Sequence, residues 1–193
     1  MRWSRLLAVA ACSLGAAAAI FALTAAAPPA KTVKQDQVKR GEYLAIIAGC
    51  NDCHTPGTLY GDPDFSRQLS GSELGWQGPW GVSYPRNLTP DVETGIGKWS
   101  KQDIVNTLRT GQRPDGSVLL PPMPWPDTSH MTESDLQALA AYLKSLPAVK
   151  HQVPNRLPPG ATPTGSFIAM PAPSAWDAPR HAPGGAPGDA SAK

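Results

Sequence analysis

The sequence predicts a small all-α domain in which three to five helices are joined by long loops. Residues 37–49, 100–110 and 132–146 carry apolar side chains at helical spacing, and each segment ends at or just before a glycine or proline. Residues 55–98 are instead rich in glycine and proline, which interrupt regular elements. Residues 154–193 contain nine prolines, nine alanines and five glycines, and this composition predicts a flexible tail.

The N-terminus has the pattern of an export segment. Arg2 and Arg5 precede an apolar run, residues 6–27, in which 11 of 22 residues are alanine. A run of this length can cross a bilayer core of about 30 Å, and the small residues at its end also fit a cleavage site. We therefore predict a signal peptide or membrane anchor at residues 1–27, a linker at residues 28–36, and a domain that lies outside the cytoplasm.

The first and last predicted helices are expected to form the core. The first places Val38, Leu44 and Ile47 at near-helical spacing, and the last begins at Thr132, a residue type that caps helices well. We expect the two helices to cross at Gly41, because the missing side chain permits a close approach.

The middle helix, residues 100–110, carries its own start and stop signals. Ser100 is a favourable cap, Asp103 occupies the position that completes a capping box, and Gly111 follows the last turn. These signals predict the boundaries of this helix from local sequence.

The motif CNDCH, residues 50–54, lies directly after the first predicted helix. Two cysteines three apart with a following histidine fit a redox dithiol, part of a zinc site or a covalently attached haem. A redox dithiol needs a preceding strand in a βαβ pattern, and zinc would need ligands from distant parts of the chain. An inert disulfide leaves His54 without a role. The haem interpretation uses Cys50 and Cys53 for thioether bonds and His54 as an iron ligand.

Met123 is the candidate for a second iron ligand. It lies in LPPMPWP, residues 120–126, where four prolines restrict the backbone and predict a stiff loop rather than a helix. Packing as an ordinary gap-filler is the alternative for Met123, whereas Met131 is expected to pack at the start of the last helix. Three histidines are expected to lie in solvent: His130, His151 and His181.

Residues 35–150 carry, in order, the motifs KRGEYLA, CNDCH, NLTPDVETGIGKWSKQDIVNTLRTG, LPPMPW and MTESDLQALAAYLKSLP. In this order they resemble a class I c-type cytochrome domain. More narrowly, they are similar to the single-haem repeat in cytochrome c subunits of bacterial periplasmic dehydrogenases that act on alcohols, aldehydes or sugar acids. The chain departs from the three-haem subunits because it contains one CxxCH motif.

The resemblance implies a small cytochrome c fold at residues 37–153, with long loops wrapped around one haem c. It implies that the haem is attached covalently to Cys50 and Cys53 and that His54 and Met123 are the axial iron ligands. Arg86 and Asn87, inside the long loop, are candidate contacts to the haem propionates, since a guanidinium fork suits a carboxylate.

The implied function is that of an electron carrier, not an enzyme. His/Met ligation leaves the iron no open site and raises its potential, which suits a monohaem cytochrome of the periplasm. Such a protein would pass single electrons from a periplasmic dehydrogenase to an oxidase or another cytochrome, as a soluble protein or tethered through residues 6–27. The alternative is a haem c protein with a labile sixth ligand that acts as a small-ligand sensor or peroxidase.

Charge argues against a nucleic-acid partner. Removal of Arg2 and Arg5 from the 17 basic residues leaves 15, against 15 acidic residues. The exported part is therefore near neutral and shows no basic stripe of the kind that binds nucleic acid.

Overall fold

The computed structural model describes residues 30–171, so the predicted signal peptide or anchor at residues 1–27 and the last part of the predicted tail lie outside the described residues. The elements are, in chain order, α1 (Ala30–Ile47), α2 (Cys50–His54), the 3₁₀ turns η1 (Thr58–Tyr60) and η2 (Phe65–Arg67), β1 (Gly75–Gly78), β2 (Gly81–Ser83), α3 (Lys101–Thr110), α4 (Trp125–Thr128), α5 (Glu133–Leu143) and β3 (Phe167–Ala169). The predicted helical class is confirmed, with one small sheet added. Between residues 30 and 171, no helix is both long and apolar enough to span a membrane.

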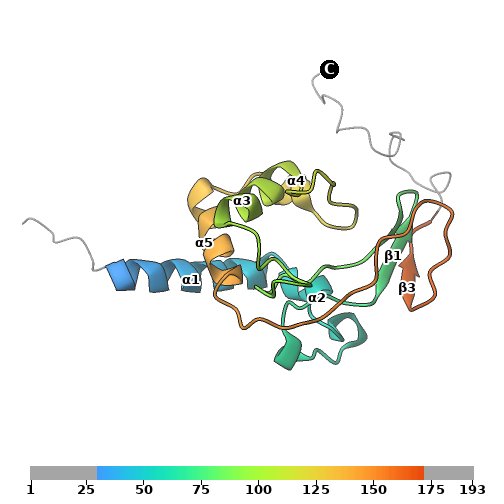
Figure 1. Cartoon of the computed structure of the whole chain (residues 1–193), viewed down its shortest axis with the longest axis horizontal. Coiled ribbons are helices and arrows are strands. Elements are labelled where there is room, and N and C mark those ends of the chain that lie inside the picture. Colours follow the sequence, from blue (N-terminus) through green and yellow to red (C-terminus); the bar gives the residue numbers. More distant parts are fainter. Residues whose placement is uncertain (1–29, 172–193) are drawn as a thin grey trace, which may run out of the picture.

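Helices α1 and α5 cross at Gly41, as predicted (Figure 1). A Cβ atom built on Gly41 would lie 2.1 Å from the carbonyl oxygen of Ala138 and 2.6 Å from Cβ of Tyr142. Only glycine allows the two backbones to come this close. An ion pair of 2.9 Å between Arg40 and Asp135 joins the same helices at the surface.

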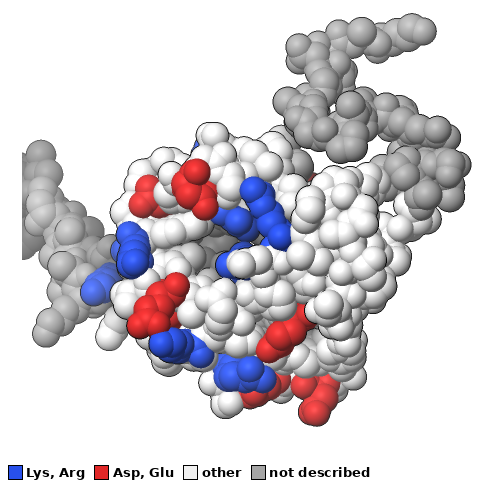
Figure 2. All heavy atoms as spheres, turned by 45° about the vertical axis from the view of Figure 1, so that its right-hand side comes forward, with Lys and Arg blue, Asp and Glu red and all other residues white. Residues whose placement is uncertain are grey.

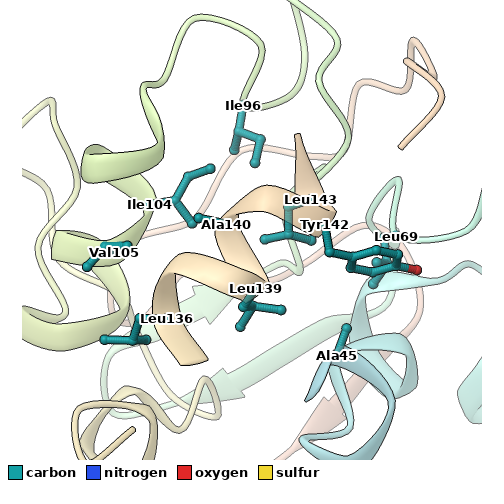
Figure 3. Close-up of a cluster of buried hydrophobic side chains, with 10 residues drawn as sticks. All are labelled: Ala45, Leu69, Ile96, Ile104, Val105, Leu136, Leu139, Ala140, Tyr142 and Leu143. Atoms are coloured by element: carbon teal, nitrogen blue, oxygen red, sulfur yellow. The ribbon is translucent and has the colours of Figure 1, made fainter. Parts of the chain in front are cut away.

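The hydrophobic core lies where α5 packs against α1 on one side and α3 on the other. Figure 3 shows the side chains of this cluster, which converge on α5 from both neighbouring helices and from the loops. Its buried members are Ala45, Leu69, Ile96, Ile104, Val105, Leu136, Leu139, Ala140, Tyr142 and Leu143. Met131 packs against the edge of this cluster, as the sequence predicted.

The observed helix boundaries show which boundaries were predicted correctly from local sequence and which were not. Ser100 and Asp103 form the predicted capping box of α3, with Asp103 N donating to Ser100 Oγ at 3.1 Å and Ser100 N donating to Asp103 Oδ2 at 2.8 Å. The predicted linker was wrong for residues 30–36, which belong to α1. Helix α5 ends at Leu143, three residues before the predicted end.

The predicted flexible tail was also wrong in its first part, because residues 154–171 lie on the domain. The sheet has the order β2-β1-β3, with β1 and β2 antiparallel and β3 added parallel to β1 (Figure 1). Leu157 also exchanges two backbone hydrogen bonds with Val82, of 3.0 and 2.9 Å. These backbone hydrogen bonds order the segment, although its low content of apolar side chains predicted a flexible tail.

Candidate haem-binding site

The CNDCH motif forms a helix of its own, α2, at the end of α1. Gly49 between them has φ 66°, a left-handed conformation that glycine adopts without a steric penalty and that redirects the chain. Within the single turn of α2, Cys50 and Cys53 are three residues apart and therefore share one side. Both are half-buried free thiols.

The thiols lack the electrostatic setting of a reactive dithiol. Burial raises the pKa of Cys50 to about 11, and burial together with the charge of Asp52 raises the pKa of Cys53. Reactive cysteines have lowered pKa values instead. Among residues 30–171 no three His, Cys, Asp or Glu side chains are grouped to hold a metal ion, so the two thiols and His54 do not converge as zinc ligands do.

The imidazole of His54 is held in one orientation by the backbone of a distant loop. Its Nδ1 lies 2.7 Å from the carbonyl oxygen of Arg86, which can only accept, so Nδ1 carries the proton and Nε2 keeps its lone pair. Burial lowers the pKa of His54 to about 4, the charge of Arg113 adds to this, and the bond to Arg86 opposes it. A neutral imidazole with a fixed tautomer is the form that ligates iron.

The Arg86 carbonyl is positioned by two loop segments that pack side by side. Leu88 N donates to Leu69 O at 2.9 Å, and Ser72 N donates to Pro85 O at 3.1 Å. Gly71 lies between these bonds, and a Cβ there would be 2.7 Å from Pro85 O, so the close approach requires glycine. The turn-rich stretch is therefore an ordered support for His54.

The loop that carries Met123 contacts β2 before the methionine and the end of α3 after it. Ser83 Oγ of β2 donates to Pro121 O at 2.5 Å, and Trp125 N donates to Met123 O at 2.9 Å. The ring of Trp125 packs on Gly111 at the end of α3. The prediction that no part of this segment is helical was wrong for its end: Pro126 lies in the first turn of α4, where a missing N–H is tolerated. Met123 itself is half-buried, and its role as a ligand stays a prediction.

Asn87 does not fit the role proposed for it. Its amide nitrogen donates to Thr94 Oγ1 at 3.0 Å and to Val149 O at 2.8 Å, while its oxygen accepts from Thr89. Both amide hydrogens are used inside the protein, so none is left for a propionate. Asn87 instead ties the loop to the segment after α5, and we withdraw the predicted propionate contact.

His151 is also a structural residue, and the prediction that it lies in solvent was wrong. Its Nδ1 lies 2.9 Å from Ser70 O and its Nε2 lies 2.7 Å from Glu73 Oε1, and its side chain is 11% exposed. Arg86 Nη1 also donates to Pro154 O at 2.9 Å. The bonds of His151 and Arg86 together hold the C-terminal segment against the loop that positions His54. Composition alone gives no signal for this role.

The residues present fit a haem. Two free thiols share one side of α2, His54 keeps an available Nε2, and the half-buried Cys50 packs against the core. The indole N–H of Trp76 is buried without a partner among the described residues, a donor that a group bearing carboxylates would satisfy. Trp76 of β1 lies opposite Ser83 of β2, and the Ser83 hydroxyl donates to Pro121 O in the loop that carries Met123. Trp76 therefore lies on the strand next to the one that contacts this loop.

Comparisons with known proteins agree with this geometry. The family model for cytochrome c matches residues 38–147. The chain is 36% identical over 129 residues to the cytochrome c subunit of a quinone alcohol dehydrogenase from Gluconobacter oxydans (strain 621H), covering 67% of this chain and 25% of that protein. It is 34% identical over 133 residues to a fructose dehydrogenase cytochrome subunit from Gluconobacter japonicus, covering 66% and 26%.

A third relative is the gluconate 2-dehydrogenase cytochrome c subunit of Pantoea cypripedii, 38% identical over 105 residues, with 54% of this chain and 22% of that protein covered. The chain thus spans about a quarter of the length of these relatives. The match to the family model includes the CNDCH motif, the loop that supports His54, helices α3 and α5, and α1 from residue 38 onwards. The chain belongs to the cytochrome c family.

Proposed function

We propose that this chain is a monohaem c-type cytochrome that carries single electrons in the bacterial periplasm. The observation that carries the proposal is the hydrogen bond between His54 Nδ1 and Arg86 O, which leaves Nε2 free on the helix that bears two unpaired thiols. One-electron transfer is the chemistry that a haem iron with two protein ligands supplies.

In this proposal the chain's own residues hold and tune the site. Cys50 and Cys53 form the thioether bonds, His54 binds the iron through Nε2, and the Arg86 carbonyl keeps the imidazole from rotating. Met123 would be the second iron ligand, in a loop whose Pro121 O accepts from Ser83 of β2 and whose Met123 O accepts from Trp125 N at the start of α4. The alternative of a labile sixth ligand requires that this loop release the thioether.

The proposed electron donor is a periplasmic dehydrogenase, and the proposed acceptor is an oxidase or another cytochrome. Support for the donor comes from the relatives, whose names describe them as cytochrome subunits of alcohol, fructose and gluconate dehydrogenases. We infer that the chain acts as an electron-transfer component and not as a catalytic one. The proposed domain at residues 37–153 is extended by the segment that ends in β3.

The test is an optical spectrum of the protein exported together with the haem-attachment machinery, oxidised and reduced, beside Met123→Ala. The proposal requires one covalent haem per chain, a low-spin reduced spectrum and a weak sulfur-to-iron band in the near infrared that Met123→Ala abolishes. Met131→Ala is the matched control, because Met131 packs on the core and should leave the band in place. A high-spin spectrum that Met123→Ala does not alter would favour the labile-ligand alternative.

A further inference from the structure

The side chain of His151 is held between two hydrogen-bond acceptors. Its Nδ1 lies 2.9 Å from Ser70 O and 3.3 Å from Ser70 Oγ, and its Nε2 lies 2.7 Å from Glu73 Oε1. A backbone carbonyl can only accept, and so can an ionised carboxylate. Both ring nitrogens of His151 therefore carry a proton when both bonds are made, and the side chain is an imidazolium paired with the carboxylate of Glu73.

The peptide group that His151 contacts is also bonded to the proposed iron ligand. Ser70 O and Gly71 N belong to one peptide group, whose oxygen accepts from His151 Nδ1. Its nitrogen donates to His54 O at 2.7 Å. A charged donor polarises such a chain of hydrogen bonds and strengthens the bond that follows. The imidazolium of His151 is therefore connected to the backbone of His54 through a single peptide group.

The support that His151 gives comes from outside the part of the chain that the family model matches. That match ends at residue 147, and His151 lies on the segment that leads from α5 to β3 (Figure 1). The loop segment that it contacts, residues 69–72, also bonds to Leu88 N and Pro85 O on either side of Arg86. Since the Arg86 carbonyl orients the imidazole of His54, His151 supports both the backbone and the ring of His54.

Loss of one proton from His151 breaks one of its two contacts. A neutral imidazole has one N–H and one lone pair. With the proton on Nδ1, the lone pair of Nε2 faces an oxygen of Glu73; with the proton on Nε2, the lone pair of Nδ1 faces Ser70 O. Either arrangement is repulsive, so deprotonation loosens the C-terminal segment from the loop. The side chain of Glu73 is 58% exposed, so the proton can leave to solvent.

The other charged groups around His151 are bonded to one another or to the protein. Arg67 pairs with Asp64 and Lys150 pairs with Glu93, while Arg86 donates to Pro154 O. Figure 2 shows Asp and Glu side chains next to Lys and Arg side chains along the lower part of one face. The charged residues on the neighbouring segments, besides Glu73, are Asp64, Arg67, Arg86, Asp91, Glu93, Lys150 and Arg156. Carboxylates, lysines and arginines ordinarily keep their charge between pH 5 and 9, whereas histidine is the side chain that ordinarily changes charge in this range.

We propose that His151 is a positioning residue for His54 and that it makes the midpoint potential of the holoprotein depend on pH. At low pH the imidazolium holds the peptide group of Ser70 and Gly71 against His54 O. When the proton leaves to solvent, this support weakens and the region loses one unit of positive charge. Loss of positive charge beside an iron ligand favours the ferric state, so the potential falls as the pH rises. This inference rests on the proposed function, because it requires that His54 bind a haem iron.

The experiment measures the midpoint potential of the isolated holoprotein from pH 5 to 9 for the parent, His151→Gln, His151→Lys and Glu73→Gln. His151→Gln should remove the fall in potential, since glutamine does not titrate. His151→Lys should keep the potential near the low-pH value of the parent, because lysine stays charged. Glu73→Gln should move the fall to lower pH by about one unit, since a carboxylate neighbour favours the charged imidazole.

His130→Gln is the matched control, because it makes the same substitution at an exposed histidine and should keep the parent profile. Nitrogen-15 NMR of the ferrous holoprotein tests the protonation of His151 directly. Both ring nitrogens should carry a proton at pH 5, and one should lose it over the pH range in which the potential falls.

Three results would overturn the proposal: a neutral His151 at pH 5, a potential that stays constant while His151 loses its proton, or a fall in potential that His151→Gln leaves in place. If His151→Gln does not assemble, Glu73→Gln keeps the test decisive, because Glu73 is exposed and an unmoved fall in potential there would also overturn it. Failure of the proposed function is separate, since it appears in the optical spectrum of the parent protein before His151 or Glu73 is changed.

Discussion

Replacement of Gly41 by alanine tests the helix crossing on which the domain depends. In an ordinary helix this change is stabilising by about 1 kcal/mol, because glycine loses more backbone entropy than alanine. Here the new Cβ would lie 2.1 Å from Ala138 O and 2.6 Å from Tyr142 Cβ, more than 1 Å inside normal contact. Both neighbours belong to α5, so α1 and α5 must separate.

The cost of such overpacking is about 1–3 kcal/mol, and a clash with backbone rather than with a flexible side chain places it at the upper end. After the propensity gain, we expect Gly41→Ala to lower the free energy of unfolding of the holoprotein by about 1–2 kcal/mol. Urea unfolding followed by far-UV circular dichroism measures this value.

Gly165→Ala is the matched control, since a Cβ there meets nothing within 4 Å. It should leave the urea midpoint within error of the parent. If Gly41→Ala proves as stable as the parent or more stable, the crossing is looser than the structure has it, and the reasoning about Gly41 fails.

Three further outcomes are expected. Ser100→Ala should destabilise the protein by about 1 kcal/mol, because α3 loses its capping box; an unchanged urea midpoint would contradict this. Val153→Ala should cost about 2 kcal/mol, as two buried methyl groups are removed, whereas Val92→Ala, at an exposed position, should be neutral. Hydrogen bonds from Thr94 lower the pKa of Asp91 below its usual value. Since the folded pKa lies below the unfolded one, its stabilisation is present above about pH 4 and is lost as the pH falls further. Thermal melts should show a smaller decline in acid for Asp91→Asn than for the parent.

The helices of the core could be predicted from the sequence because the residues that cap them and form their apolar faces lie within a few turns of one another. The Ser100 and Asp103 box, the apolar stripe of α5 and the need for glycine at position 41 each act within one element or at one crossing. The CNDCH motif likewise determines that the two thiols and the imidazole lie close together, since all three belong to five consecutive residues. The family resemblance rests on these same short motifs, and the family-model match confirms it.

Tertiary structure decided what depends on residues that are distant in the chain. The partner of His54 is a backbone carbonyl 32 residues away, and composition does not show which carbonyl a folded loop presents. In the sequence, Asn87 and Arg86 were both candidates for a propionate contact. In the fold, the amide nitrogen of Asn87 donates to Val149 O and Thr94 Oγ1, whereas Arg86 donates to Pro154 O. Residues 154–171 were expected to be flexible because they bury little apolar surface, but backbone pairing with β1 and β2 orders them. Long-range hydrogen bonds of this kind have no periodicity or composition of their own, so only the folded chain reveals them.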